Sequence, residues 1–406
     1  MANAQDITAP LARSAVATRE HHLSARITPD LNTVSDLWQA LEADPAVTFH
    51  QSRAWVEAWT DGTGVDLAIV TLEQNGSPFA ILPLEIEQMN GLKIARFAGT
   101  AYSNENTGLV DTHKQGRLEP ISARDLGRAL SQAGLAADIV LFDKMTPETA
   151  ARPPFSALPR VFHQNPSLQL PLLPDFAAVL AQINGKRRRK KFRVSERRLE
   201  AMGGYRHITG DTDDQALRLL DTFLDQKPVR LTAQGLPNVF ADPGIHAFLR
   251  QLATTRDADG KAALELHGIE LAGGEFQGEI IAVAGLTIKD GHVTCQFGSI
   301  SEDIAADASA GELLFFRMIE HYSTDQYEVF DFGVGDQLYK RSWCPQRTAL
   351  VDCYVPLNLK GRLAAPLVAG AIRLKRAIKT SPALHRIASR LRGLTLSKPQ
   401  VPAEAD

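Results

Sequence analysis

The chain has 406 residues, a formal net charge of −3 and 44% hydrophobic residues. This length and apolar content predict two folded domains and exclude a globally disordered protein. Cys295, Cys344 and Cys353 have neither CxxC nor Cys/His spacing, so they indicate neither a disulfide framework nor a bound metal. Three sparse thiols fit a reducing compartment, and we expect a cytoplasmic protein.

The N-terminal half is predicted to be a disordered tail at residues 1–28, followed by a domain at residues 29–165. The tail is rich in Ala, Thr and Ser and lacks the apolar core of a secretory signal. Helical spacing predicts one helix around Trp38 and a second that is capped by Ser52. Three strand-like runs follow, at Leu67–Leu72, Phe79–Ile86 and Leu92–Phe97. Asn-Gly pairs separate them and predict hairpins. A helix near Ser122–Gln132 and a strand at Asp138–Phe142 complete the half.

The second half, residues 166–355, repeats this order after a boundary marked by Pro153-Pro154 and Asn165-Pro166. Its predicted helices are Asp175–Ile183, Lys186–Met202, Asp213–Gln226 and Pro243–Ala253, and its strands are Ala263–Leu271, Glu279–Lys289 and His292–Ser299. An Asp-Gly pair predicts the hairpin between the last two strands. The pattern predicts a mixed α/β protein in which both halves share one plan.

A helix and a buried strand close the second half. Ser309 with Glu312 three residues later predicts a capping box, so a helix starts there. Tyr327–Phe332 is short, aromatic and β-branched, which is typical of a buried strand, and Tyr339 lies on a further helix. A helix start exposes unpaired N–H groups at the positive end of a dipole, which favours a phosphate.

Two basic segments stand out against the weakly acidic total. Lys186–Arg198 holds nine basic residues in thirteen positions. Like charges at helical spacing repel, so this helix is either a solvated face or a contact for an anionic partner. A nucleic acid is disfavoured because few aromatic residues are interleaved with the charges.

The C-terminal tail, residues 356–406, is predicted to be basic and amphipathic. Residues 360–398 hold ten Lys/Arg and no acidic residue. One reading is a terminal helix that packs on the protein. The other is a segment lying on an anionic membrane, peripheral to the inner membrane. The longest apolar run is interrupted by Pro366 and Gly370, so we expect no membrane-spanning helix.

The order of these motifs resembles the GNAT superfamily of acyltransferases. More narrowly, it is similar to the branch of cellulose-biosynthesis CelD-like acetyltransferases, which is related to the FemABX aminoacyl transferases. The resemblance is carried by Ser309-Ala310-Gly311, Phe330-Asp331-Phe332-Gly333, Tyr339-Lys340, the basic helix and Phe49-His50-Gln51-Ser52. It implies two tandem GNAT-like domains in an α/β fold and acetyl-CoA as the acyl donor.

The resemblance also implies roles for single residues. Ser309, Ala310 and Gly311 would bind the donor, although the usual glycine-rich phosphate loop is replaced by Ala305–Ala308. Asp331 would position or deprotonate the acceptor, or simply bond the turn after it, since burial can raise the pKa of a carboxyl group. Tyr339 would protonate the leaving thiolate or belong to the core, and Asp336 is a further catalytic candidate. Substrate contacts are predicted for Arg187, Arg188, Lys191 and Lys340.

The predicted function is transfer of an acyl group, from acetyl-CoA, to a hydroxyl or amine of a saccharide or cell-envelope precursor. One alternative is a FemABX-like transferase that uses aminoacyl-tRNA. Another is a catalytically silent scaffold in a polysaccharide-synthesis complex.

Overall fold

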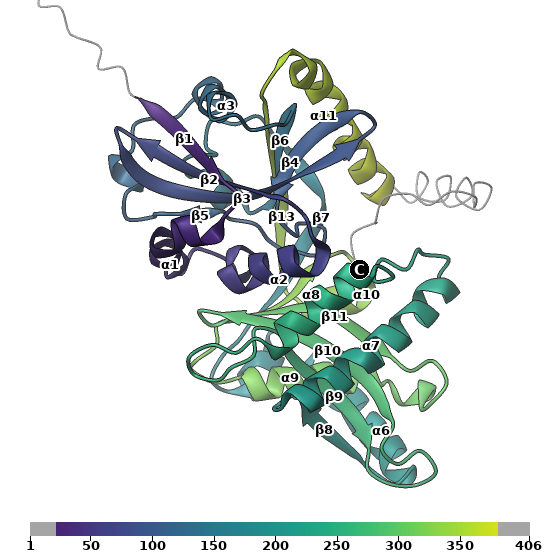
Figure 1. Ribbon diagram of the computed structural model, residues 1–406. Coiled ribbons are helices and arrows are strands. Elements are labelled where there is room, and N and C mark those ends of the chain that lie inside the picture. The colour runs from purple at the N-terminus through teal and green to yellow at the C-terminus, as the bar shows by residue number, and fades with distance from the viewer. Residues whose placement is uncertain (1–21, 381–406) are drawn as a thin grey trace, which may run out of the picture.

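The computed structural model describes residues 22–380 as two copies of one plan, stacked end to end (Figure 1). Each copy consists of a strand, two helices, three antiparallel strands, a helix, a strand, a short helix and a last strand. The first copy is β1 Leu23–Thr28, α1 Ser35–Glu42, α2 Arg53–Thr63, β2 Leu67–Gln74, β3 Ser77–Met89, β4 Leu92–Phe97, α3 Ala123–Gln132, β6 Ile139–Met145, α4 Pro147–Ala150 and β7 Arg160–Pro171. The second is β8 Tyr205–Thr209, α7 Asp213–Ala233, α8 Pro243–Thr254, β9 Glu265–Leu271, β10 Ile280–Lys289, β11 His292–Ile300, α9 Ala310–Tyr322, β12 Val329–Val334, α10 Leu338–Trp343 and β13 Gln346–Pro356.

Apart from four short 3-10 helices, at Leu31–Val34, Phe49–Gln51, Gln115–Arg117 and Ala306–Ala308, four elements of the described chain lie outside this repeat. They are β5 Leu109–Val110, which pairs with β3, the helices α5 Phe176–Ala181 and α6 Gly185–Ala201 between the copies, and α11 Leu359–Thr380 at the end. No helix among residues 22–380 is long and apolar enough to cross a membrane.

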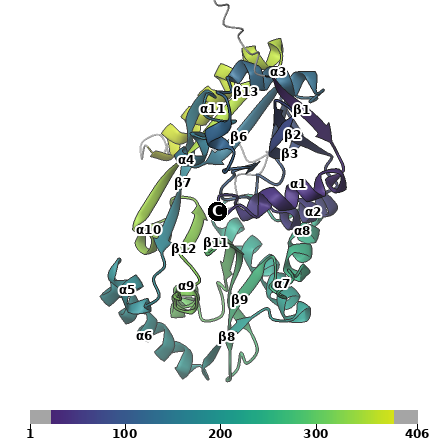
Figure 2. The ribbon, with the colours of Figure 1, turned by 90° about the vertical axis from the view of Figure 1, so that its left-hand side faces the viewer.

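The two copies exchange their last strands, which makes one continuous sheet of thirteen strands within the described residues. β7, from the first copy, pairs with β12 of the second, and β13, from the second, pairs with β6 of the first. β7 and β13 also pair with each other (Figure 2). The boundary predicted at residues 165–166 therefore falls inside β7, a strand shared by both halves.

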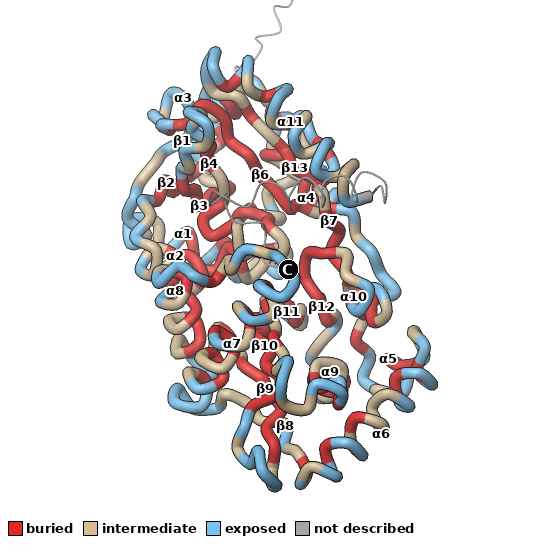
Figure 3. Tube along the Cα trace, turned by 90° about the vertical axis from the view of Figure 1, so that its right-hand side faces the viewer, coloured by how far each residue is buried: buried red, intermediate tan, exposed pale blue. Residues whose placement is uncertain are grey.

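Helices cover both faces of the sheet, and one hydrophobic core joins the copies. α2 of the first copy packs against α8 of the second, and Trp55, Trp59 and Phe248 lie in this shared core. The helix backbones approach closely because α2 carries Gly62: a Cβ added there would lie 2.5 Å from the Phe248 nitrogen. On the other face, α9 and α6 pack on the second copy, and α3 packs on the first. The strands are largely buried and the outer helix faces are exposed (Figure 3).

Local sequence signals place most elements within a few residues. β4 has its predicted bounds, and the three hairpin dipeptides adopt positive φ at both residues, as a tight hairpin turn requires. The predicted tail at residues 1–28 is wrong at its end, because Leu23–Thr28 forms β1, paired antiparallel with β2. The rest of that tail, and the tail beyond Thr380, lie outside the described residues.

Candidate active site

The sheet of the second copy opens into a wedge between β11 and β12. These parallel strands pair only from His292 to Thr294 and from Val329 to Asp331. β11 then continues to Ile300 and β12 to Val334 without further pairing between them in the described chain. Gly333 adopts φ 75°, so β12 turns where the pairing ends. The end of β11 thus offers a free backbone edge, to which an extended amide chain can bond.

Asn104, from the first copy, closes one side of this wedge. Its side-chain oxygen accepts a hydrogen bond from the Val334 N–H at 2.8 Å, and its side-chain nitrogen donates to Gln296 Oε1 at 3.0 Å. Gln296 belongs to β11 and Val334 to β12, so one asparagine spans both walls. The wedge therefore depends on residues from both halves of the chain.

His50 and Gln51 hold the loop that carries Asn104. His50 Nδ1 donates to the Glu105 carbonyl at 3.0 Å, so its Nε2 accepts, here from the Gln296 amide at 3.0 Å. Burial lowers the pKa of His50 to about 4, so this imidazole is neutral at physiological pH. The Gln51 side chain accepts from the Thr107 N–H at 2.9 Å. These residues of the Phe49–Ser52 motif thus position the loop.

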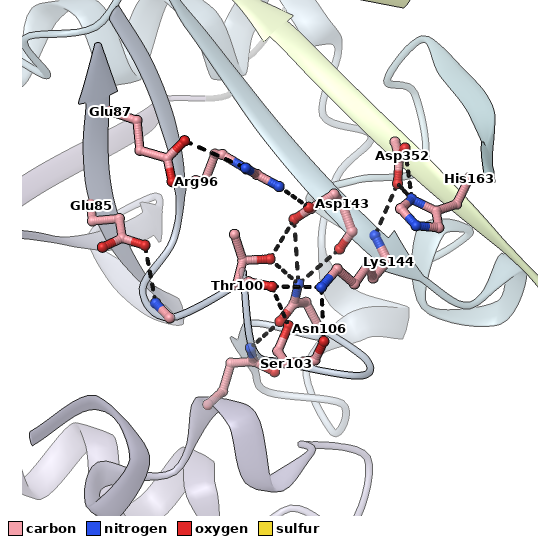
Figure 4. A network of polar contacts seen from close by, with 12 residues as sticks. Glu85, Glu87, Arg96, Thr100, Ser103, Asn106, Asp143, Lys144, His163 and Asp352 are labelled. Carbon is pink, nitrogen blue, oxygen red and sulfur yellow. Dashed lines mark hydrogen bonds and ion pairs between the residues drawn. The ribbon is translucent and has the colours of Figure 1, made fainter. Parts of the chain in front are cut away.

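A buried polar network fixes the same loop from the other side (Figure 4). Thr100 Oγ1 donates to Asp143 at 2.7 Å, and Asn106 donates to both residues. Lys144 Nζ donates to the carbonyls of Thr100 at 2.6 Å and Ser103 at 2.8 Å. Neighbouring Arg96 and Lys144 hold the pKa of Asp143 below its usual value although burial opposes this, so the network contains a paired, ionised carboxylate. A loop bonded at so many points is rigid enough to form a site wall.

A narrow pocket lies where this loop meets the wedge. It has room of about 20 Å³ for water-sized molecules, enough for a water or the tip of a slender group. Its polar lining includes Asn104, Lys144 and Gln296, and its apolar lining includes Phe240 and Phe248 of the second copy. Tyr102 also lines it, and its hydroxyl donates to the Val239 carbonyl at 2.5 Å. The pocket therefore sets a few polar groups beside an apolar floor at one side of the wedge.

Asp331 lies at the apex of the wedge as a saturated, ionised carboxylate. It accepts hydrogen bonds from the Gly333 N–H at 2.7 Å and from the Gln169 side-chain amide at 2.9 Å. The Ser167 hydroxyl lies 3.1 Å from each of the two carboxylate oxygens. His292 Nε2 lies 3.3 Å from Asp331 Oδ2. Burial raises the pKa of Asp331, but His292 and the other donors outweigh it and lower the pKa overall. The expectation that the pKa of Asp331 is raised toward neutrality is wrong, whereas the expected hydrogen bond from the following turn is present, from the Gly333 N–H.

Glu105, and not Asp331, has a carboxyl group whose pKa is raised toward neutrality. Burial, reinforced by repulsion from Asp331 and opposed by His292, raises its pKa to about 7. Its backbone carbonyl binds His50, while its carboxyl group has no hydrogen-bond partner among the described residues. Glu105 was not among the residues predicted from the sequence. No local motif marks it, because its pKa depends on strands nearly two hundred residues away.

The residues predicted on α10 point in different directions. Lys340 is buried, and its ammonium donates to the Val334 carbonyl at 3.0 Å, at the end of the wedge. Tyr339 is partly exposed and stacks on Phe315 of α9, with ring centroids 5.8 Å apart. Asp336 pairs with Arg341 at 2.6 Å and Arg347 at 3.1 Å, at the surface. Lys340 is therefore the predicted residue of this group that directly contacts a wedge wall.

The start of α9 differs in detail from the predicted capping box. The helix does begin at Ala310, but Ser309 has φ 55° and its side chain caps no N–H group. The Glu312 side chain turns instead to Arg188 and to Lys191, the latter at 3.4 Å. The left-handed Ser309 leaves Ala310 and Gly311 in the first turn, with their N–H groups at the positive end of the helix dipole.

The basic helix α6 runs beside this helix start. Arg188 is buried, pairs with Glu312, donates to Ser342 at 2.5 Å and stacks on Trp343, 4.0 Å from its ring centre. Arg198 pairs with Asp307 at 3.6 Å. Arg187 is exposed, and no contact of its side chain joins it to the helix start. Of the three predicted substrate-binding bases on α6, Arg188 and Lys191 therefore lie at α9, and Arg188 is tied into the fold.

Residues 186–341 match the family model of the acetyltransferase (GNAT) domain, a segment that runs from α6 into α10 and includes both strands of the wedge. The second copy is therefore similar to a GNAT acetyltransferase domain, and the first copy repeats its order of elements in a mixed α/β fold. No curated protein matches the chain.

Three solved structures are similar to this chain over most of its length. The crystal structure of FemX superposes with a TM-score of 0.54 at 12% identity, covering 84% of this chain and 99% of that one. At this identity the likeness shows the fold alone. The C-terminal domain of a putative lysylphosphatidylglycerol synthetase from Agrobacterium fabrum has a TM-score of 0.48 at 12% identity, covering 83% and 96%. A tandem GNAT protein from the clavulanic acid biosynthesis pathway has a TM-score of 0.42 at 12% identity, covering 82% and 99%.

Proposed function

We propose that the protein transfers an acyl group from acetyl-CoA to a hydroxyl or amine of a saccharide or cell-envelope precursor, in the wedge between β11 and β12. The observation that carries the proposal is the position of the wedge. It lies inside the segment that matches the GNAT domain, between a helix start on one side and a polar pocket on the other. The saccharide acceptor follows from the resemblance to CelD-like proteins.

The start of α9 fits the phosphates of the donor. Two buried donors there, Arg188 Nε and Trp343 Nε1, have no acceptor among the described residues. Leaving buried donors unsatisfied costs free energy, so an acceptor from a ligand or water is expected beside them. Asp307 and Glu312 would repel a phosphate, but bases of α6 pair with both. Backbone N–H groups and these bases would hold the pyrophosphate.

The transfer itself needs positioning and two proton movements. The donor supplies an acetyl thioester; the acceptor oxygen or nitrogen bonds to the acyl carbon, the C–S bond breaks, and the acceptor proton leaves. Glu105, with a pKa of about 7, is the carboxyl group suited to receive that proton near neutral pH. Tyr339 is our candidate for protonating the thiolate. Holding the two reactants together supplies most of the acceleration in direct transfer.

The decisive experiment measures thiol release from acetyl-CoA in the presence of amino sugars, nucleotide sugars and other envelope precursors. We expect turnover with one acceptor class, and stabilisation by acetyl-CoA of about 2.7 kcal/mol at a hundredfold excess over Kd. Transfer from aminoacyl-tRNA without any thioester effect would favour the aminoacyl alternative. If no donor gives either activity or stabilisation, the result would favour the catalytically silent scaffold.

Gly311→Val gives a matched test of the donor site. A Cβ at residue 311 would lie 3.0 Å from Ile300 Cγ2, so a branched side chain crowds the first turn of α9. We expect this variant to lose the stabilisation by acetyl-CoA. Gly116→Val is the control, because nothing lies within 4 Å of a Cβ at that position. Equal stabilisation of both variants would place the donor elsewhere.

A further inference from the structure

The last helix of the described chain, α11, packs on the sheet with its small residues inward. Ala365 and Ala369 are buried, and Ala365 lies in a cluster with Ile94, Ile139 and Leu141. The large side chains face outward: Leu359, Leu363, Leu367 and Leu374 are 71%, 69%, 74% and 59% exposed. Their spacing of four, four and seven residues puts them on one helix face, here called the leucine stripe. Of the eleven large apolar side chains that the described residues expose, these are four.

Basic residues border the leucine stripe on both sides. At 100° per residue, Arg362 and Arg373 fall along one border, and Lys360 and Lys375 along the other. All four are exposed, although Lys360 pairs with Asp138 at 3.0 Å, and α11 contains no acidic residue. An apolar stripe between rows of long basic side chains is the pattern of a helix that lies in a membrane interface, with its cations at the level of the lipid phosphates.

An arginine-lined groove adjoins the stripe. It has a volume of about 450 Å³ and is lined by Arg160, Arg373 and Arg376 together with Phe162 and other apolar residues of β7, β13 and α11. The Arg376 guanidinium lies 4.6 Å from the centre of the Phe162 ring, which is itself exposed. Arg373 belongs to both the groove and the border of the stripe. Several guanidinium groups over an apolar floor suit a phosphodiester joined to a hydrocarbon chain.

The geometry points to an anionic phospholipid membrane as the partner of the α11 face. The leucine stripe would enter the boundary between headgroups and acyl chains, and the groove would take a lipid phosphate. A second copy of this chain is a poor occupant, because its own basic residues would face those of the α11 face and repel them. The chain beyond α11 is a poor occupant for the same reason, since it adds Arg386, Arg390, Arg392 and Lys398 before any acidic residue.

The test is co-sedimentation of the full-length protein with vesicles. We expect binding to vesicles of equal phosphatidylglycerol and phosphatidylcholine, and little to phosphatidylcholine alone. A rise from 0.15 M to 0.5 M salt should weaken binding, because the charges are exposed. Each neutralised base, as in Arg373→Gln, should weaken it about fivefold. Equal pelleting with neutral vesicles, or none with anionic ones, overturns the proposal.

The leucine stripe has its own variant and control. Leu363→Gln with Leu367→Gln should reduce binding at least tenfold without lowering the melting temperature, because both side chains are exposed. Val229→Gln, at an exposed position of α7, removes an apolar side chain far from α11 in the sequence and should bind as the wild type does. Wild-type binding by the double variant would assign the contact to residues beyond α11. If the wild-type protein forms a dimer in the absence of vesicles and the double variant does not, the leucine stripe would be assigned to contact with a second copy. Either result overturns the proposal.

Discussion

The Asn104 side chain binds the Val334 N–H at 2.8 Å, across 230 residues of sequence. The same amide holds Gln296 of the opposite wall, so the first copy of the repeat completes the wedge that the second copy opens. This contact explains how a single cavity can need both halves of the chain. The loop from Ala98 to Thr107, which carries Asn104, is therefore part of the candidate site.

We predict that Asn104→Leu, which keeps the volume but removes both bonds, lowers kcat/KM by about tenfold to a hundredfold. The unpaired Val334 N–H and Gln296 side-chain oxygen should cost about 1–3 kcal/mol of stability each if water does not replace the lost partner. Steady-state kinetics and chemical denaturation measure the two effects. Asn32→Leu, at an exposed position, is the control. A large loss of stability with unchanged kinetics would make the contact purely structural.

Arg187 and Arg188 are neighbours with different predicted effects. Arg188 is buried between Glu312, Ser342 and Trp343, whereas Arg187 is exposed. Removing one partner of a buried pair costs about 3–5 kcal/mol, so Arg188→Ala should destabilise strongly. Arg187→Ala should stay within about 0.5 kcal/mol of the wild type. Urea denaturation of both variants tests this, and equal losses would contradict the burial.

Local patterns predicted the frame of the fold well. Hairpin turns such as Asn90-Gly91 need a backbone conformation that few residue pairs adopt readily, so they mark their strands reliably. The repeat of element order also predicted the tandem architecture. The strand exchange was not predictable, because β7 and β13 carry no signal that says which of two similar sheets each will join.

The candidate site was only partly predictable, for a physical reason. Ser309–Gly311 and Asp331 carry local signals, a helix start and a polar residue in a buried strand. Asn104 and Glu105 carry none, since their roles arise from contacts with β11 and β12 of the other copy. The Ser309–Glu312 capping box failed because Arg188 and Lys191 offer Glu312 stronger, charged partners.

Because of the pair of His292 and Asp331, we predict that stability falls both as pH rises through the pKa of His292 and as pH falls through the pKa of Asp331. Hydrogen bonding to Asp331 raises the pKa of His292 above its usual 6.5 although burial opposes it. A raised pKa means that this contribution is complete below pH 6.5 and is lost as pH rises through the folded-state pKa. The pKa of Asp331 is lowered below 3.8, so its contribution is present above that pH and is lost as pH falls through the lower value.

We therefore expect His292→Gln to be less stable than the wild type near pH 6, with the difference shrinking toward pH 9. Melting temperatures of both proteins across this range, at constant ionic strength, are the measurement. His113→Gln is the control, because His113 lies on a surface loop away from the wedge. A constant difference across the range would show that His292 acts without its proton.

Glu105 leads to the last prediction, which concerns the pH dependence of the reaction. If its carboxylate receives the acceptor proton, kcat/KM should rise tenfold per pH unit at low pH and level off near pH 7, where the carboxyl group is half ionised. Glu105→Gln should lower kcat/KM by roughly 10²-fold or more and remove this ionisation from the profile. Glu275→Gln, which alters an exposed carboxyl group in the loop between β9 and β10, should leave both unchanged. The same substitution separates catalysis from folding. Because the folded-state pKa of about 7 exceeds the usual 4.5, the Glu105 carboxyl group costs stability that grows as pH rises from 4.5 to 7 and is constant above pH 7. The stability of Glu105→Gln relative to the wild type should therefore rise over that range and stay level up to pH 9. If that gain is observed while the rate profile keeps its inflection, the pKa of Glu105 is raised as expected but another group takes the proton.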